Sequence, residues 1–418
     1  MQVLPEIDAL TMSSTAKGWP RVKVCMHSLG TACTDYRLMR NATALLKAGF
    51  AVTIVDIEAD RSRPAQEEIQ GIIIKHIIRP SWFVPTRFKP WFLVKLMVMF
   101  IIGFVQLMRT EADIYHAYIE KALPACYLVA RLRHKPFVFD APELPLSEQN
   151  VTRWRTLTAL STHLLFIMMR RCAGVIAVSM PIVEEICKRY HLPEVTLIRN
   201  VPSYRPVQKS NRLREYLGLS SEKHIALYQG NIQSDRGLDR LVRAAPFLEP
   251  NIVLVVMGKG SSILSSQLEA LIASEGVTER VKIIPPIPYI ELLDWTSSAD
   301  IGLIVLPPDY SPSIRWCLPN KLFEYLMAGL PVLASQLDAV VEIIKTNDVG
   351  QVVFSLSPVD IAQAINTILS DCNALARMRR NALAAAKSEF YWEKESQKLI
   401  RLYNSILLQH NKKEEELI

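Results

Sequence analysis

The sequence predicts an α/β protein built from two doubly wound domains, each with a mostly parallel sheet. Three observations indicate this fold class. The chain has 418 residues, which is more than one hydrophobic core usually supports. Short apolar runs rich in Val and Ile alternate with amphipathic helical stretches, as in β-α-β units whose strands are buried on both faces. The alternation stops at a polar stretch, residues 203–220, and then begins again.

The first half contains the units of one such domain. We expect a flexible lead over residues 1–20, a first domain over 21–203 and helices over 36–49 and 121–133. A further short strand, 114–116, is expected to end at His116. The other predicted strands are 21–26, 51–57, 72–78, 136–140 and 174–178.

The second half repeats the pattern and predicts a second domain over residues 204–390. A separate helix follows over about 391–410. Two doubly wound domains in tandem usually bind ligands in a cleft at the carboxyl ends of their strands. The predicted strands are 224–228, 252–258, 281–284, 301–306 and 331–334.

Composition and charge narrow the class of protein. The seven cysteines form no CxxC pair, which favours reduced thiols in a cytoplasmic protein over a disulfide framework or a zinc site. Up to Arg205 there are 26 Lys and Arg against 17 Asp and Glu, a net charge of +9, whereas the remainder carries −2. The basic residues are scattered among apolar segments without stacking aromatics, so a nucleic-acid partner is not expected. An anionic membrane surface suits the same charge.

One apolar segment, residues 91–108, has the length of a membrane helix but contains Lys95. The β-α-β pattern continues on both sides of it. Trp82, Arg87, Lys89 and Trp91 combine cations and aromatics at its start, as in an interfacial anchor. We therefore expect a helix lying in the membrane interface; a buried core helix and a membrane span are the alternatives.

The segment 318–334 carries the most informative chemistry. It predicts a loop, a short helix ended by Gly329 and a buried strand. A helix N-terminus with Lys321 in its first turn suits a diphosphate, and Glu324 offers a carboxylate that accepts hydrogen bonds from ribose hydroxyls. The alternative is a solvated Lys/Glu pair on an ordinary helix. The candidate donor residues in this segment are Asn320, Lys321, Leu322 and Glu324.

A second loop follows the predicted strand 224–228. Gly230 and Asn231 open the loop, and Arg236 precedes a helix expected to start near Leu238. A strand followed by a glycine-bearing loop and a helix is a common phosphate-binding arrangement, and Arg236 has the geometry to bind the anion through two nitrogens. Gly230, Asn231 and Arg236 are therefore further candidate donor-binding residues.

Taken together, these motifs resemble those of the retaining glycosyltransferases of family 4, which have the GT-B fold. The resemblance extends from about Arg21 to Tyr403. It implies that Arg236 and Lys321 bind the diphosphate of a nucleotide-sugar donor, that Glu324 binds its ribose and that helix 391–410 packs back on the first domain. The segments that match in order are 35–37, 113–116, 140–144, 178–179, 200–202, 228–231, 236–238 and 319–334.

The sequence departs from the family pattern at three positions. Trp316 stands eight residues before Glu324, where relatives often have a glutamate that faces the sugar. Pro142 replaces a histidine that usually contacts the transferred sugar, and proline has no side-chain donor. Asn231 replaces an arginine. The motifs therefore predict nucleotide binding and leave the contacts to the sugar open.

Four further residues are candidates for the reaction or the acceptor. His116 and Glu143 are the catalytic candidates, and Asp35 and Arg37 are expected on the acceptor side. A structural histidine, a loop cap and a helix-capping ion pair are the respective alternatives. No His, Asp or Glu cluster has metal-ligand spacing, so neither an essential metal nor another cofactor is expected.

These observations predict a glycosyltransferase that uses a nucleotide-diphosphate sugar. The apolar, basic first domain favours a lipid-linked or saccharide acceptor, in polysaccharide or glycolipid biosynthesis at the cytoplasmic face of the membrane. Retention of configuration follows from the resemblance alone. A nucleotide-sugar epimerase on the same fold and a catalytically weak nucleotide-sugar-binding protein are the alternatives.

Overall fold

The computed structural model describes residues 21–80, 89–146 and 155–415. The expected flexible lead, residues 1–20, lies outside the described residues, as do Trp82 and Arg87. The chain divides into two compact units, residues 1–139 with 404–418, and residues 140–403. The predicted domain boundary near residue 203 stays a prediction.

Unit 1 contains a mainly parallel sheet in the strand order β3-β4-β2-β1-β5-β6. All five residues of β5 are buried, as expected for a strand covered on both faces. Strand β3 pairs antiparallel with β4. The elements are β1 (Lys23–His27), η1 (Ala32–Thr34), α1 (Tyr36–Lys47), β2 (Ala51–Glu58), β3 (Gln66–Ile69), β4 (Ile72–Ile78), α2 (Lys89–Met108), β5 (Ile114–Tyr118), η2 (Glu120–Ala122), α3 (Leu123–Leu132) and β6 (Phe137–Ala141).

Unit 2 begins within β6 and contains a second, fully parallel sheet of six strands, in the order β11-β10-β9-β12-β13-β14. A parallel pair, β7 with β8, precedes it. Its first elements are α4 (Arg155–Met169), β7 (Gly174–Ala177), α5 (Met180–Tyr190), β8 (Thr196–Leu197), α6 (Arg212–Leu217), β9 (His224–Gln229), η4 (Ser234–Arg236), α7 (Leu238–Ala244), η5 (Ala245–Phe247), β10 (Ile252–Met257), α8 (Ser262–Ser274) and β11 (Val281–Ile284).

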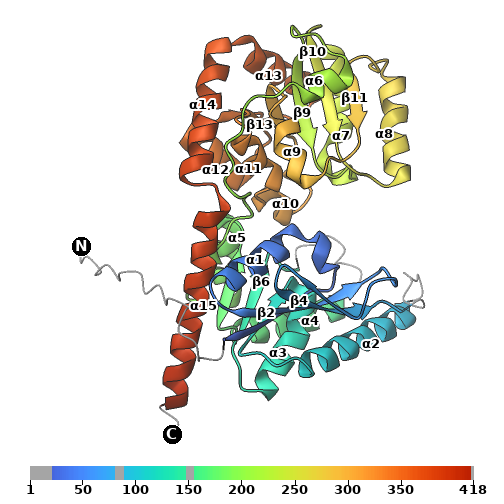
Figure 1. The fold of residues 1–418 in the computed structure, drawn as a ribbon. Helices are drawn as coiled ribbons and strands as arrows, with labels where there is room; N and C mark the ends of the chain where they lie inside the picture. The colour runs from blue at the N-terminus through green and yellow to red at the C-terminus, as the bar shows by residue number, and fades with distance from the viewer. Residues whose placement is uncertain (1–20, 81–88, 147–154, 416–418) are drawn as a thin grey trace. The chain divides into compact units, whose positions relative to one another are not determined.

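Helices surround the second sheet (Figure 1). Helices α7, α8 and α13 share one hydrophobic core with its strands, and α9, α11 and α14 form another packed group. The remaining elements are α9 (Tyr289–Thr296), β12 (Ile301–Ile304), α10 (Pro312–Trp316), α11 (Asn320–Met327), β13 (Val332–Ala334), α12 (Asp338–Asn347), β14 (Gly350–Val352), α13 (Pro358–Ser370), α14 (Cys372–Ser388) and α15 (Trp392–Glu415).

The structure confirms the α/β class with two largely parallel sheets, and most predicted strands agree to within two residues. One difference bears on function, because β5 continues to Tyr118 and places His116 in mid-strand, not at a strand end. Three short strands, β3, β8 and β14, were not predicted, because segments of two to four residues carry little periodicity.

Candidate functional site

The residues predicted to bind the donor come together in unit 2, where β9 ends. Gly230 follows β9 with a φ of +127°, and α11 begins at Asn320. A Cβ built on Gly230 would lie 3.4 Å from Nζ of Lys321. The loop after β9 and the first turn of α11 therefore meet at this point, as the sequence predicted.

Lys321 is the most unusual group at this site. It is buried, and its ammonium has no hydrogen-bond partner among the described residues. The nitrogen lies 3.6 Å from the centre of the Tyr228 ring, a cation–π contact. Burial and the neighbouring charge of Arg236 lower the pKa of Lys321 to about 7. A buried cation with unused donors is costly, so its environment is suited to an anion that accepts from it.

Arg236 adds a second positive charge beside Lys321. Its Nη1 lies 3.5 Å from Oδ2 of Asp235, and its side chain is partly exposed. Tyr228 shapes the loop between them, because its hydroxyl donates to the carbonyl of Asn231 at 2.8 Å. Two cations and the N-terminus of an eight-residue helix thus surround one position.

Glu324 is held in place by Gln229, the last residue of β9. The Gln229 amide donates to Oε2 of Glu324 and accepts from the Thr296 hydroxyl at 2.7 Å. The Tyr325 hydroxyl fixes the same strand end, because it accepts from the Gln229 backbone N–H and donates to the Leu227 carbonyl, both at 3.0 Å. Glu324 is half-buried, which leaves a carboxylate fixed in orientation and partly open to solvent.

Two predicted donor residues have side chains engaged elsewhere. Leu322 is fully buried and packs in the core, and its backbone N–H donates to the Pro319 carbonyl at 2.9 Å. The amide oxygen of Asn320 accepts from Asn200 at 2.7 Å. The side chain of Leu322 therefore belongs to the core. Leu322 and Asn320 both lie in the first turn of α11 and help to shape it.

Trp316 stands where relatives often have a glutamate. Its indole N–H donates to Asp338 at 3.1 Å, and its carbonyl accepts from the Ser179 hydroxyl at 2.6 Å. The tryptophan thus packs its polar atom against α12. It offers no carboxylate to a sugar.

Glu143 lies in the same unit, in the loop after β6, and is exposed. Burial raises the pKa of Cys317 to about 12; Arg236 and Lys321 oppose this shift and Glu143 adds to it. The charges of Arg236, Lys321 and Glu143 therefore all act on the thiol of Cys317, three residues before α11 begins. A catalytic role for Glu143 stays a prediction.

The other candidate residues, His116, Asp35 and Arg37, belong to unit 1. His116 is fully buried inside β5. Asp35 caps α1 by accepting from the Leu38 N–H at 3.0 Å and from the Tyr118 hydroxyl at 3.1 Å. Arg37 is buried in the first turn of that helix. Their catalytic and acceptor roles stay predictions.

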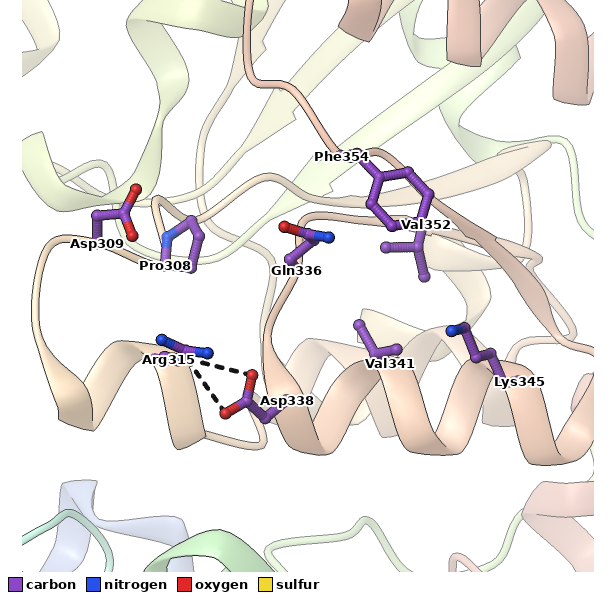
Figure 2. Close-up of a pocket in the computed structure, with 9 residues that line it drawn as sticks. All are labelled: Pro308, Asp309, Arg315, Gln336, Asp338, Val341, Lys345, Val352 and Phe354. Atoms are coloured by element: carbon purple, nitrogen blue, oxygen red, sulfur yellow. Dashed lines mark hydrogen bonds and ion pairs between the residues drawn. The ribbon is translucent and has the colours of Figure 1, made fainter.

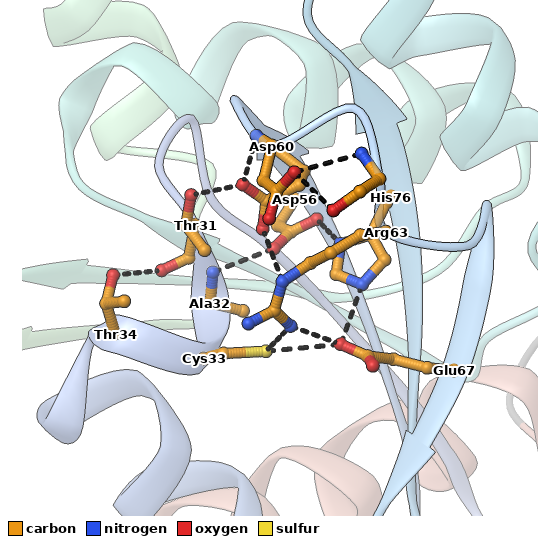
Figure 3. A network of polar contacts seen from close by, with 11 residues as sticks. Thr31, Ala32, Cys33, Thr34, Asp56, Asp60, Arg63, Glu67 and His76 are labelled. Atoms are coloured by element: carbon orange, nitrogen blue, oxygen red, sulfur yellow. Dashed lines mark hydrogen bonds and ion pairs between the residues drawn. The ribbon is translucent and has the colours of Figure 1, made fainter.

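Unit 1 contains a polar cluster that was not predicted from the spacing of residues in the sequence. Ligand-type atoms of Asp56, Glu58 and His76 all lie within 4.8 Å of one another, and the three residues are buried. His76 Nδ1 is 2.7 Å from Asp56 Oδ1, and its Nε2 is 3.0 Å from Glu67 Oε1 (Figure 3). Arg63 supplies positive charge to Glu58 at 3.4 Å and to Glu67 at 2.6 Å.

This cluster fixes the turn η1, which follows β1. The Ala32 N–H donates to Asp56 at 2.7 Å, the Thr31 hydroxyl donates to Glu58 at 3.2 Å, and the Cys33 thiol donates to Glu67 at 3.4 Å. Burial raises the pKa of Asp56. The internal ion pairs favour a structural role for the cluster.

The family comparisons agree with the resemblance seen in the motifs. A family model described as Glycosyltransferase Family 4 matches residues 37–201, and one described as Glycosyl transferases group 1 matches residues 209–385. The chain belongs to this glycosyltransferase family. The second match contains the loop after β9 and the start of α11, so the proposed donor residues lie in the group 1 part.

Curated glycosyltransferases are similar to part of the chain. A D-inositol 3-phosphate glycosyltransferase from Xylanimonas cellulosilytica is 30% identical over 193 residues, which cover 46% of this chain and 44% of that protein. The chain spans about half the length of the curated relatives it matches.

Solved structures confirm the GT-B fold. Sucrose-phosphate synthase from Thermosynechococcus elongatus has a TM-score of 0.76 at 17% identity, with 93% of this chain and 100% of that chain covered. Anabaena HepE in complex with UDP has a TM-score of 0.68 at 15% identity, with coverages of 92% and 100%. At this identity the likeness concerns the fold alone.

Proposed function

We propose that the protein transfers a sugar from a nucleotide-diphosphate sugar to an acceptor hydroxyl, and that unit 2 holds the donor. The observation that carries this proposal is the buried ammonium of Lys321, which has no hydrogen-bond partner among the described residues and lies beside Gly230. A diphosphate bound there would accept from Lys321 and Arg236 and from the first backbone N–H groups of α11.

The ribose would be bound by Glu324. A carboxylate accepts two hydroxyl hydrogen bonds from adjacent ribose oxygens, provided that it is fixed in orientation. The amide of Gln229 supplies this fixation. Lys321 and Glu324 are separated by one helical turn, so phosphate and ribose contacts come from one rigid element.

In the reaction, the bond between the anomeric carbon and the diphosphate oxygen breaks, and the acceptor oxygen bonds to that carbon and loses its proton. Negative charge grows on the departing diphosphate, and Lys321 and Arg236 would stabilise it. We propose that these cations act in place of an essential metal. Retention of configuration, predicted from the family resemblance, is part of the proposal.

The proposal includes a lipid-linked acceptor and peripheral contact with an anionic membrane, because α2 exposes apolar side chains. Its exposed residues recur three or four positions apart and therefore lie on one face. Exposed Leu128 and Leu132 belong to α3, which packs against α2. Exposed Arg109 and Arg131 end the two helices. The exposed apolar residues of α2 are Trp91, Val94, Met97, Ile101 and Val105, each at least 39% exposed.

Apolar side chains directed outward and cations near the helix ends support the proposed interfacial helix. Among the residues that the structure describes, no helix has both the length and the apolar character needed to cross a bilayer. Sedimentation with vesicles tests membrane contact. We expect binding to vesicles containing phosphatidylglycerol and its loss in the double variant Met97→Glu/Ile101→Glu. The variant Ile290→Glu, at another exposed apolar side chain, is the matched control; equal binding by all three proteins would refute the membrane contact.

A phosphorylated polyol is the second candidate acceptor, since the relatives in the curated comparison include D-inositol 3-phosphate glycosyltransferases. A pair of reactions distinguishes the acceptors: labelled UDP-glucose with inositol phosphate, and the same donor with a polyprenyl diphosphate sugar. The product carries the label in only one of them.

Product analysis also tests the reaction type. A transferase forms UDP and a labelled product only when acceptor is present. An epimerase, the first alternative, converts the sugar without an acceptor. A binding protein without catalysis, the second alternative, forms no product from any donor; a full set of donors and acceptors without turnover would therefore overturn the proposed transferase activity.

A further inference from the structure

Unit 2 contains a pocket that neither Lys321 nor Glu324 lines. It is a pocket of about 430 Å³ beyond the carboxyl ends of β12, β13 and β14, against α12. This edge of a doubly wound sheet is where ligands usually bind. The volume falls in the range of small-molecule sites, and none of the predicted donor residues lines the pocket.

The two ends of the lining differ (Figure 2). Val341, Val352 and Phe354 lie at one end together with Lys345, and Phe354 is 72% exposed. Asp309, Arg315 and Asp338 lie at the other end beside Pro308, with Gln336 between the two groups. A ligand that fits this division has one apolar face and hydrogen-bonding groups at its edges.

The charges of the pocket cancel. Arg315 and Lys345 are opposed by Asp309 and Asp338, and Arg315 is already bound to both oxygens of Asp338 at 3.2 Å. No net field therefore attracts an anion such as a free phosphate. The side chains of Asp309, Gln336 and Lys345 make no hydrogen bond or ion pair with another described residue, so acceptors and donors are available to a neutral ligand.

We propose that this pocket binds a neutral saccharide at a site separate from the nucleotide. The C–H face of a pyranose ring would pack on Phe354, and its hydroxyls would pair with Gln336 and Asp309. The inference stands without the proposed transfer reaction, because it rests on the pocket alone. Trp316 links the two regions, since its indole N–H donates to Asp338.

Saturation-transfer difference NMR on the full chain tests the proposal, with the methyl glycosides of glucose, galactose, mannose and N-acetylglucosamine as probes. We expect transfer to at least one glycoside, unchanged by saturating UDP. Phe354→Ala should weaken its binding about tenfold, as expected for losing the apolar contact of one ring. Gln336→Ala should weaken binding too, whereas Phe247→Ala, at another exposed ring of unit 2, should bind like the unaltered protein.

Three results would overturn the inference. The first is no transfer to any of the four glycosides. The second is displacement of the bound glycoside by UDP, which would assign it to the nucleotide site. The third is equal binding by Phe354→Ala and Phe247→Ala. Both phenylalanines are exposed, so a folding defect in one variant alone is not expected.

Discussion

The ammonium of Lys321 lies 3.6 Å from the centre of the Tyr228 ring and makes no hydrogen bond within the described residues. The Tyr228 ring thus contacts the buried Lys321 nitrogen without occupying its hydrogen-bond donors. The ring attracts the charge by its electrostatics but accepts no conventional hydrogen bond. The donors of Lys321 thus stay available for a diphosphate, and the next two predictions depend on this group.

Lys321→Met should weaken UDP binding roughly tenfold to hundredfold, the usual contribution of hydrogen bonds to a charged group. The folded protein should be at least as stable as before, because the variant no longer buries a charge. Calorimetric titration with UDP and a thermal melt measure the two effects. Lys387→Met, at an exposed lysine of α14, is the matched control; equal UDP affinity in both variants would show that Lys321 does not bind the diphosphate.

Donor affinity should fall as the pH rises above 7. Burial lowers the pKa of Lys321 to about 7, and a bound diphosphate would raise it by favouring the charged form. Binding then takes up a proton, so the affinity is full below pH 7 and falls by up to about tenfold per pH unit above it. UDP-glucose is the suitable ligand, because its diphosphate has no proton to lose in this range.

Titrations from pH 6 to 9, in buffers of different ionisation enthalpy, measure this proton uptake. Lys321→Arg should remove it, because a guanidinium stays charged throughout the range. An affinity for UDP-glucose that does not change between pH 6 and 9 would contradict the assignment.

Gly302→Ala should disturb the donor site indirectly, by displacing Tyr325. A Cβ at this position would lie 2.4 Å from ring carbons of Tyr325, whose hydroxyl fixes the end of β9 beside Gln229. We expect a loss of about 1–3 kcal/mol of stability, as for other overpacked cores, and weaker UDP binding. Urea unfolding and calorimetry measure these changes. Gly30→Ala, where nothing lies within 4 Å of an added Cβ, should change neither.

His76→Ala should destabilise the protein by about 1–3 kcal/mol, because the buried Asp56 loses a hydrogen-bond partner and Glu67 loses one of its partners. His163, an exposed histidine of α4, provides the control variant His163→Ala. Denaturant unfolding measures the difference. If both variants unfold at the same denaturant concentration, the cluster does not stabilise η1 as described.

The sequence predicted the parts of the fold that depend on local pattern. Strands such as β10 are continuous apolar runs, and a parallel sheet covered on both faces requires such runs. The adjacency of Lys321 and Glu324 was also predictable, because both lie within one turn of one helix; their donor-binding roles stay predictions. The prediction that His116 ends a strand was wrong. Strand β5 includes two further residues, Ala117 and Tyr118, and the sequence does not distinguish them from a loop.

Contacts between distant segments could not be predicted in this way. Gln229 and Glu324 are 95 residues apart in the sequence, and the packing of α11 against the end of β9 brings them together. Asp56 and His76 lie on neighbouring strands, β2 and β4, whose register sets their side chains face to face. Short-range spacing contains no information about either pair.

The proposed donor site requires Lys321 to hold the nucleotide diphosphate and Glu324 to hold its ribose. Calorimetric titration of UDP into Glu324→Ala tests it most directly, with Glu342→Ala, at an exposed glutamate of α12, as the matched control. We expect Glu324→Ala to lose at least tenfold in affinity and Glu342→Ala to bind like the unaltered protein. Unchanged UDP affinity in a folded Glu324→Ala protein would contradict it.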